Sequence, residues 1–572
     1  MSEPTTQPTT QPTTQLPRSV RVAFWLLLGW SVVVVQQWAF ITKLGLGTTA
    51  GLVNIFYYLF ASYELLGWFT LVLALAVSLV ACANSRPSAL EADASRRIPL
   101  GALHRRLGLL GLLGLLWCGT LLIHHSYPFS MDEYNSLFQA EIFARGQLTA
   151  SIPELFRPYA KALTPMFVTH DPTAATWSGS YLPVYSALRA LGFKLGLTEL
   201  LNPLLAVASV VLIADCAGRL WPARPLLRLV AATLLLSSTQ FWAMSISYYS
   251  MPAHLCANLL WLHLYLRGTR GALALLPWVG GLAIGLHQPI VHPLFVAPFC
   301  LDIVRRRKWV LASYCVVVYC GFLALWYYWH GLTALEETKL HAHDFAWFRW
   351  PGPELMFVQS INLTLSGTWQ SAALLLCGAS ALGGLRSFSA ALWSLLAGVL
   401  LTLLLHFFFF TNQGHGWGYR YIYGVLGNVA LLATYGFSRL CELLGQPRAL
   451  RLLVVSTCVA LFIQLPLRAF EIEREIRPFA RVQDFLRGLP EKIVVVDRTY
   501  VWYGQDLIRN DPSFTKTPLL VDANRGQTLH GLRRLGSVRV VRPLELASFE
   551  IPVSPKLEEH ERTRQRAASV AR

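Results

Sequence analysis

Two adjacent carboxylates, Asp132 and Glu133, are the residues of this sequence whose types and spacing best fit catalysis. They follow an apolar run and open a stretch with the spacing of an amphipathic helix, which Gly146 ends. A carboxylate within hydrogen-bond reach of a hydroxyl can act as a general base. A structural role is also open, because Ser130 and Glu133 have capping-box spacing and acids favour the first helical turn.

Arg420 is the candidate cation. It lies in the aromatic stretch 416–421, between two apolar runs. A guanidinium can hold a phosphate through two hydrogen bonds and take up negative charge that grows on it. The alternative is that Arg420 only anchors the chain at the membrane interface among aromatic residues.

The composition places these residues in a membrane protein. Of 572 residues, 54% are hydrophobic and only 14% are charged, and the mean hydropathy is +0.45, which is too apolar for a water-soluble chain of this length. The net charge of +17 could suggest a nucleic-acid partner. We expect none, because Lys and Arg cluster in short connections between apolar runs, as the positive-inside rule requires.

The apolar runs predict an all-α polytopic protein with about thirteen spans. Every connection on one side is basic, so we expect a cytoplasmic N-terminus and a C-terminal region outside the membrane. The predicted spans are 22–41, 64–83, 107–125, 202–218, 228–247, 252–268, 272–287, 289–304, 309–330, 366–384, 389–410, 424–441 and 452–470. Pro289 and Pro293 leave open a broken or re-entrant pair at 272–304, with His287 and His292 beside the break. We give these histidines no role, since a neutral imidazole can satisfy backbone groups freed there.

Four regions flank or contain the spans. Residues 1–21 read as a disordered cytoplasmic tail with a Thr/Gln/Pro repeat. The membrane domain, 22–470, includes a long outer loop at 126–201. Residues 471–553 alternate helical and strand-like runs, with strands expected at 492–496, 518–521 and 538–541 and helices at 471–489 and 526–535. They predict a small extracytoplasmic α/β domain, followed by a charged tail at 554–572.

Short motifs in this order resemble the membrane glycosyltransferases of the C-type fold. Within these the chain is similar to the group that contains protein O-mannosyltransferases, lipid A aminoarabinose transferases and rhizobial lipopolysaccharide galacturonosyltransferases. The motifs are Asp132-Glu133 and the segments 144–148, 179–185, 201–204, 416–421 and 509–512. The resemblance spans about residues 107–540 and implies a bacterial cytoplasmic-membrane enzyme. It would move a sugar from a polyprenyl-phosphate donor to a lipid, glycan or protein acceptor on the outer face.

The resemblance gives the candidate residues their roles. Asp132 would be the base, with Glu133 as its partner, and Arg420 would hold the carrier phosphate. Two surface helices, the second at about 184–197, would let the polyprenyl tail stay among the membrane lipids. The tail domain would cover the outer face and help to select the acceptor.

Other polar residues complete the expected cavity. Family members often place a second polar group where His254 stands, and no carboxylate lies in that loop here. His415, Trp417 and Lys339 are expected beside the donor phosphate. Asp171 and Tyr181 are candidates for acceptor contact or a second acid, although Asp-Pro at 171–172 is also an ordinary turn signal.

The sequence requires no metal or other cofactor. The pair His341 and His343, close to Asp344, has no assured third ligand, so a loop that is solvated or contacts the carrier phosphate is expected instead. A competing hypothesis is a transporter or lipid flippase, and a third is a membrane scaffold. A transporter should show internal repeats and ionisable groups in the middle of its spans. We find no clear repeat and few such groups.

Overall fold

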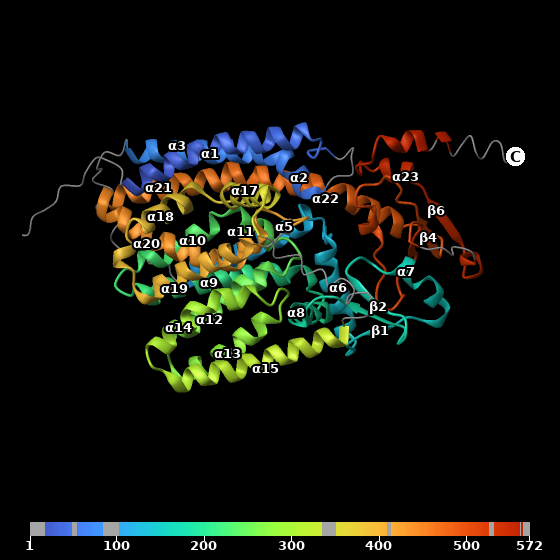
Figure 1. Ribbon diagram of the computed structural model, residues 1–572, viewed down its shortest axis with the longest axis horizontal. Coiled ribbons are helices and arrows are strands. Elements are labelled where there is room, and N and C mark those ends of the chain that lie inside the picture. Colours follow the sequence, from blue (N-terminus) through green and yellow to red (C-terminus); the bar gives the residue numbers. More distant parts are fainter. Residues whose placement is uncertain are drawn as a thin grey trace, which may run out of the picture.

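A bundle of helices with two small sheets at one end forms the protein (Figure 1). The computed structural model describes residues 18–48, 54–83, 102–333, 350–408, 413–525, 531–560 and 562–563. The predicted N-terminal repeat and Lys339, His341, His343 and Asp344 lie outside the described residues.

The bundle contains most of the helices. In chain order they are α1 (Arg18–Lys43), α2 (Ile55–Leu59), the π turn η1 (Phe60–Glu64), α3 (Leu65–Ala83), α5 (Ala102–Leu122), α9 (Leu201–Leu220), α10 (Leu226–Leu236), α11 (Thr239–Ser245), α12 (Met251–Arg267), α13 (Arg270–Ile284), α14 (Val291–Arg305), α15 (Trp309–Thr333), α17 (Pro353–Thr368), α18 (Ala372–Leu382), α19 (Ala390–Phe407), α20 (Leu426–Leu444), α21 (Gln446–Val459), the π turn η6 (Ala460–Gln464) and α22 (Leu465–Arg487). Short 3-10 turns precede α9, α19 and α20, namely η3 (Thr198–Leu200), η4 (Leu385–Ser387) and η5 (Arg420–Val425).

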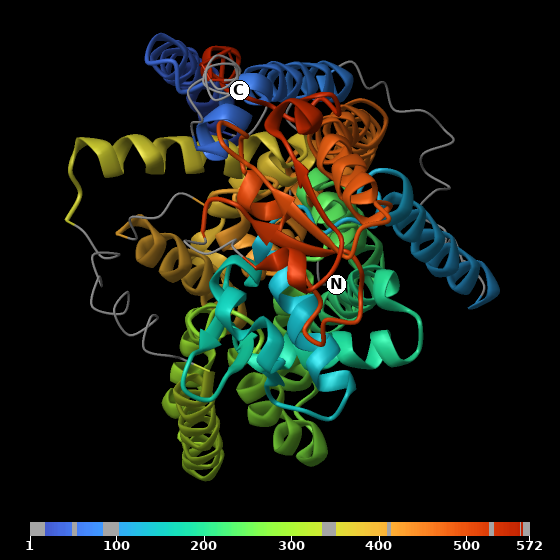
Figure 2. The same cartoon turned by 90° about the vertical axis from the view of Figure 1, so that its right-hand side faces the viewer.

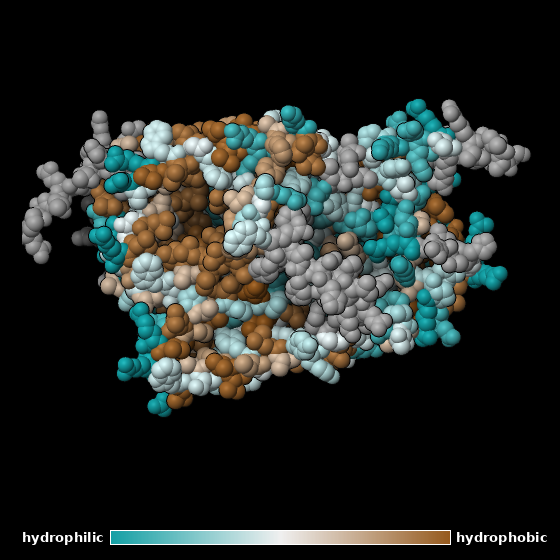
Figure 3. Space-filling model, viewed as in Figure 1, coloured by the Kyte–Doolittle hydropathy of each residue, from teal (hydrophilic) through white to brown (hydrophobic). Residues whose placement is uncertain are grey.

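Seven described helices are long and apolar enough to cross a membrane, or eight if α10 and α11 count as one bent span. The chain is therefore a multi-pass membrane protein. Its viewed face shows brown, apolar residues over the bundle and teal, polar residues at both ends (Figure 3). The predicted count of thirteen is not reached by this criterion, because helices at other predicted spans, such as α12 to α14, have 15 to 17 residues. That count stays a prediction.

The predicted span 228–247 corresponds to two helices, α10 and α11, which meet at an angle of 69°. Ser237 and Ser238 occupy the bend. The Ser238 hydroxyl caps α11 by accepting from the backbone N–H of Phe241, and the Ser237 hydroxyl lies 2.7 Å from that of Ser371. Serine side chains compete with the helical backbone for hydrogen bonds, and here they end one helix and begin the next.

One unbroken helix of 42 residues, α21–η6–α22, runs from Gln446 to Arg487. It contains both the predicted span 452–470 and the predicted tail helix 471–489. The predicted boundary at residue 471 therefore falls within a helix, so no flexible linker separates the last span from the residues that follow it.

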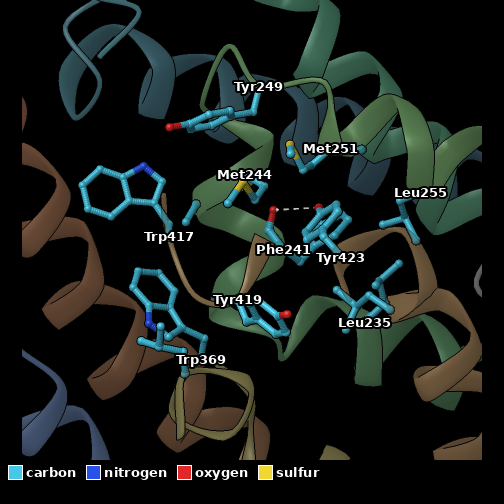
Figure 4. Packing of buried hydrophobic residues seen from close by; sticks show 14 of the residues in the cluster. Leu235, Phe241, Met244, Tyr249, Met251, Leu255, Trp369, Trp417, Tyr419 and Tyr423 are labelled. Atoms are coloured by element: carbon cyan, nitrogen blue, oxygen red, sulfur yellow. Dashed lines mark hydrogen bonds between the residues drawn. The ribbon is translucent and has the colours of Figure 1, made fainter. Parts of the chain in front are cut away.

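Close helix packing fixes the inner part of the bundle. Helices α18 and α20 meet at Gly436, where an added Cβ would lie 1.8 Å from the carbonyl oxygen of Cys377. Only glycine permits this approach. Nearby, the ring of Trp417, in the loop before α20, lies 6.4 Å from that of Trp369 (Figure 4). These two large buried side chains pack the loop that leads to Arg420 against the helix bundle.

The tail region, 488–560, contains a parallel sheet in the order β5–β4–β6. Its strands are β4 (Ile493–Val496), β5 (Leu519–Asp522) and β6 (Val538–Val541), all three within one residue of the predicted bounds. Short turns and a helix complete it: η7 (Gly504–Leu507), η8 (Leu532–Arg534) and α23 (Pro543–Ala547). The predicted helix at 526–535 is reduced to the 3-10 turn η8 in its described part.

The outer loop 126–201 has its own small antiparallel sheet, which was not predicted. Its elements are α6 (Met131–Ala144), β1 (Ala150–Ser151), η2 (Glu154–Tyr159), α7 (Ala160–Leu163), β2 (Val168–Asp171), β3 (Thr176–Gly179) and α8 (Pro183–Lys194), the last of these at the predicted second surface helix. Trp177 of β3 donates to the carbonyl of Pro512 at 2.9 Å and stacks on Phe514 at 4.7 Å. The loop and the tail region therefore form one polar end of the molecule, which faces the viewer in Figure 2.

Candidate functional site

Helix α6 begins with a complete capping box, and this box positions Asp132. The Ser130 hydroxyl accepts from the backbone N–H of Glu133 at 3.3 Å, and the Glu133 carboxylate accepts from the backbone N–H of Ser130 at 2.8 Å. Because the entry of the helix is fixed by two reciprocal bonds, the Asp132 side chain leaves the first turn in a defined direction.

Glu133 has a structural role in this arrangement, because its carboxylate binds backbone N–H groups. Its second oxygen accepts from the backbone N–H of Tyr248 at 2.8 Å, so both carboxylate oxygens are occupied. The side chain is fully buried, and burial raises the pKa of Glu133 to about 7 against the opposing effect of the two N–H donors. Of the two acids, Glu133 joins the loop 246–250 to the start of α6, and Asp132 alone contacts Arg420.

Asp132 and Arg420 form a buried ion pair. One terminal nitrogen of Arg420 lies 2.7 Å from Oδ2 of Asp132, and the Tyr181 hydroxyl donates to the other oxygen. Burial by itself raises the pKa of Asp132, but the charge of Arg420, nearby His287 and the Tyr181 hydrogen bond together hold it below its usual value. The structure thus brings together three predicted site residues and keeps the carboxylate ionised near neutral pH.

The loop 413–419 holds the guanidinium of Arg420 in place. The carbonyl of Gln413 accepts from the second terminal nitrogen at 2.7 Å, while its side-chain amide accepts from the backbone N–H of Arg420 at 2.9 Å. Gly418, at φ +67°, allows the loop to turn against Trp369. The ring of Tyr249 lies 5.1 Å from the guanidinium carbon. Nε of Arg420 is buried with no hydrogen-bond partner among the described residues.

A small pocket opens beside the ion pair. The residues around it that bear on chemistry are Asp132, Tyr181, Tyr185, Ser186, Tyr249 and His287. His287 lies in the loop between α13 and α14, and its ring meets that of Tyr181 edge to face at 4.2 Å. Burial lowers the pKa of His287 to about 4, so its imidazole is neutral at physiological pH. No role was predicted for this histidine, and the structure places it at the pocket wall.

A second layer of hydrogen bonds fixes the loop that lines the pocket. The Tyr185 hydroxyl donates to the carbonyl of Tyr249 at 2.7 Å, and the Asn202 amide donates to the same carbonyl at 2.8 Å. Arg189 donates to the Tyr185 hydroxyl at 2.6 Å and to the carbonyl of Tyr248 at 3.0 Å. The motifs at 179–185 and 201–204 thus hold the loop that carries Tyr249.

The tail region fixes the other side of α6. Arg509 donates to the carbonyls of Pro128 and Phe129 at 2.6 and 3.3 Å, and its guanidinium covers the ring of Tyr127 at 4.0 Å. These residues directly precede the Ser130 cap. The motif at 509–512 therefore aligns the segment that leads into Asp132.

Asp506 is a buried acid of the tail region that was not among the predicted site residues. Its carboxylate lies 3.8 Å from Nε2 of His415, and the His415 ring packs edge to face on Phe129 at 4.9 Å. Burial raises the pKa of Asp506 to about 7, and burial lowers that of His415 to about 3. No sequence motif marks Asp506; the 3-10 turn that buries it appears only in the fold.

The remaining candidates lie apart from the ion pair. Trp417 is buried in the core against Phe129, at a ring distance of 6.0 Å. His254, in α12, is buried, and neither ring nitrogen has a hydrogen-bond partner among the described residues. Asp171 accepts from the backbone N–H groups of the two residues that follow Pro172, at 2.8 and 3.0 Å, which is the geometry of a turn. Lys339 lies outside the described residues.

In the part of the chain that is described, no group of three His, Cys, Asp or Glu side chains could hold a metal ion.

The site can do two things chemically. Its ionised carboxylate can accept a proton from a group that enters the pocket. Its guanidinium, which has one donor to spare, can stabilise an anion in surroundings with little water. Both groups belong to connections at the polar end of the helix bundle, so a ligand could keep an apolar tail among the helices while its polar head reaches the pocket.

The fold is shared with a solved membrane protein. No protein-family model matches the sequence, and no curated protein matches it. ArnT from Cupriavidus metallidurans, crystallised with bound undecaprenyl phosphate, is 14% identical to this chain with a TM-score of 0.50 over 72% of this chain and 86% of its own. Its apo structure gives 13% identity and a TM-score of 0.49 over 71% and 84%. The chain thus has the fold of the C-type membrane glycosyltransferases, as its motifs predicted.

Proposed function

We propose that the protein transfers a sugar from a polyprenyl-phosphate donor to an acceptor on the outer face of a bacterial cytoplasmic membrane. The observation that carries the proposal is the Asp132–Arg420 ion pair at 2.7 Å beside a pocket at the polar end of the bundle. The fold supports it, since the ArnT structure of this fold was solved with undecaprenyl phosphate. The N-terminus would be cytoplasmic, and residues 471–553 would form the outer domain.

Asp132 is the proposed general base. The oxygen of an acceptor hydroxyl forms a bond to the anomeric carbon, and its proton passes to Asp132. The bond from that carbon to the phosphate oxygen breaks, and polyprenyl phosphate leaves with the electron pair. Tyr181 orients the carboxylate, while Glu133 and Ser130 fix the helical turn from which it projects.

Arg420 is the proposed contact for the leaving phosphate. In the resting protein its terminal nitrogen binds Asp132, which keeps the carboxylate a weak base. A bound donor phosphate would compete for that nitrogen. As the hydrogen bond to Asp132 weakens, burial raises the proton affinity of the carboxylate. The base would therefore become active when the donor is in place.

The other predicted residues take lesser roles in this proposal. His254, His415 and Trp417 shape the buried walls near the donor, and Lys339 is proposed to contact the carrier phosphate from the segment between α15 and α17. Asp171 was a candidate second acid. Its turn hydrogen bonds leave Asp506 better placed for that role, through its contact with His415.

Replacement of Asp132 by Asn tests the proposal. In proteoliposomes that contain the polyprenyl-phosphate sugars of the native membrane, we expect transfer to fall by about 10²–10⁴-fold, the usual contribution of a general base. Asp484→Asn, at an exposed position of α22, is the matched control and should transfer like the wild type.

Retained turnover in Asp132→Asn would remove Asp132 from its role. If the wild-type protein moved labelled carrier lipid across the bilayer and transferred no sugar, the flippase hypothesis would replace the transferase.

A further inference from the structure

A polar groove lies in the tail region, apart from the pocket at Asp132. Six side chains define it: Asn54, Arg498, Tyr500, Tyr503, Gln505 and Asn524. Most of them belong to the segments that follow strands β4 and β5. Neither these residues nor the groove has a role in the transfer step described above.

The sheet topology puts the groove where parallel sheets bind ligands. Strand β4 lies in the centre of the order β5–β4–β6, so the chain passes to one side of β4 and then crosses to the other. In open parallel sheets, ligands bind outside the carboxyl ends of the strands near such a reversal. Arg498 follows the end of β4 by two residues, and Asn524 follows β5 by the same interval.

The groove backbone is held in an unusual conformation. Tyr500 and Tyr503 adopt φ of +63° and +51°, in the left-handed region that residues other than glycine rarely occupy. Such residues persist where the surroundings fix them, and they cluster at ligand sites. Here the Tyr503 hydroxyl accepts from the backbone N–H of Ile55 at 3.2 Å, which ties the groove to the first residue of a candidate span.

The side chains of the groove offer the groups that bind sugars. The Gln505 amide and the Tyr500 hydroxyl can each donate and accept, as sugar hydroxyls do. The Asn524 amide accepts from the backbone N–H of Arg498 at 3.2 Å and donates to the Thr499 hydroxyl at 3.0 Å, which leaves it one further N–H for a ligand. Nε of Arg498 is held at 3.0 Å from both oxygens of Asp522, and its terminal nitrogens make no hydrogen bond within the described chain. Aromatic rings with a few convergent polar groups are the usual lining of a small-ligand site.

The groove adjoins the candidate active site. The ring of Tyr503 packs edge to face on His415 at 4.4 Å. Gln505 is followed by Asp506, whose carboxylate lies beside His415, and His415 packs on Phe129 just before the α6 cap. One wall of side chains thus separates the groove from the segment that leads to Asp132.

We propose that this groove binds sugar residues of the acceptor, which is therefore a glycan. The inference rests on the proposed transferase function and narrows its acceptor from lipid, glycan or protein to a carbohydrate. Because Ile55 opens a span beside the groove, a glycan with a lipid anchor could occupy it while the anchor stays in the membrane.

Glycan binding by the full-length protein in nanodiscs tests the inference. The probe is a panel of immobilised bacterial cell-envelope oligosaccharides, presented without any donor. We expect the wild type to bind a subset, and the double variant Gln505→Ala/Asn524→Ala to bind that subset at least about tenfold more weakly, as for the loss of two hydrogen bonds. Arg533→Ala, at an exposed position of the same region outside the groove, should bind like the wild type.

Two controls keep the outcome clear. The thermal midpoint of the double variant should match that of the wild type, and its affinity for undecaprenyl phosphate should be unchanged. If the double variant melts early, Gln505→Ala alone replaces it, because the Asn524 amide also holds the backbone of Arg498. Equal glycan binding by variant and wild type, or no binding to any glycan of the panel, would overturn the inference. Failure of sugar transfer would instead count against the proposed function, since this assay contains no donor.

Discussion

The protein contains two buried carboxylate–guanidinium clusters, and they differ in how many hydrogen-bond partners the arginine has. One is the Asp132–Arg420 pair at the pocket. The other, within the bundle, joins Glu64 at the start of α3 to Arg468 of α22. Each connects an acid from the first quarter of the chain with an arginine from the last third, and each arginine lies against an aromatic ring.

The bundle cluster is fully occupied. Arg468 binds both oxygens of Glu64, at 3.0 and 2.9 Å, and Glu471 at 2.7 Å. Glu64 also accepts from the Thr368 hydroxyl and the Trp369 indole. The guanidinium lies 4.1 Å from the Trp369 ring. Both terminal nitrogens of the guanidinium are hydrogen-bonded, the second also to the carbonyl of Thr368 at 3.4 Å, so this cluster cross-links η1, α17 and α22.

The site cluster is incomplete by comparison. Arg420 makes one contact with Asp132, its Nε has no partner among the described residues, and Asp132 faces a pocket. A buried charge that lacks a full set of partners destabilises the resting state and is available to a ligand. The comparison therefore separates a structural ion pair from a candidate catalytic one by hydrogen bonds alone.

Removing the charge of Glu64 should have the largest effect on stability. Glu64→Gln leaves Arg468 buried with one acid in place of two, and breaking a buried pair costs about 3–5 kcal/mol. We expect a large fall in the thermal midpoint of the detergent-purified protein. Asp132→Asn, measured in parallel, should lower the midpoint less, because Asp132 is more exposed than Glu64 and Arg420 keeps its hydrogen bond to the Gln413 carbonyl. Equal losses in the two variants would contradict the distinction between the clusters.

Arg420→Ala should act on binding more than on folding. Loss of charged hydrogen bonds to a phosphate is worth about 1.5–3 kcal/mol, or about ten- to a hundredfold in affinity. Titration with undecaprenyl phosphate, followed by calorimetry, measures this change. Arg439→Ala, which removes an arginine from α20 away from the site, is the control. Unchanged affinity in Arg420→Ala would make Arg420 an interfacial anchor.

The buried acid beside the site should give stability a pH dependence. Because burial raises the folded-state pKa of Asp506 to about 7, the folded chain binds its proton more tightly than the unfolded chain. Stability from this group is present below pH 4 and is lost as the pH rises from about 4 to 7. Asp506→Asn should narrow the gap in thermal midpoint between pH 5 and pH 8 by about 2–4 °C. An unaltered gap would mean that Asp506 does not titrate in this window.

The smallest effect is expected at Asp171. Its two backbone hydrogen bonds close a turn at the edge of the loop sheet, and their loss should cost about 1 kcal/mol. Asp171→Ala should leave sugar transfer within about twofold of wild type. A hundredfold loss of transfer with unchanged stability would restore Asp171 as a second acid.

The sequence predicted those parts of the fold that depend on local pattern. Ser130, the acids after it and Gly146 fix the limits of α6, and alternating apolar runs fix the three tail strands to within a residue. The α10–α11 bend was missed because two serines in an apolar run do not break its hydropathy. The continuous helix through residue 471 was predicted as two elements, because the residues change there from apolar to polar. The helical spacing itself continues across residue 471 without a break.

Both residues of the ion pair were candidates from the sequence, but their direct contact and their surroundings were not predicted. Asp132 and Arg420 stand next to long apolar runs, where a charge is conspicuous. Asp506 and His287 gain their importance from contacts with His415 and Tyr181, each about 90 or more residues away in sequence, and no local pattern predicts those contacts. The pairing of Tyr181 with Asp132 likewise depends on how α8 packs on α6.

Arg509 binds the carbonyls just before α6, and Arg420 completes the ion pair, so the pocket draws on residues from the far end of the chain. A ribosome adds about 5–20 residues each second and starts from the N-terminus. The loop that bears Asp132 must therefore wait some tens of seconds after its own synthesis before its last contacts exist. During that interval the nascent protein has the carboxylate but lacks the arginine beside it, so the ion pair cannot form until residue 420 has been made.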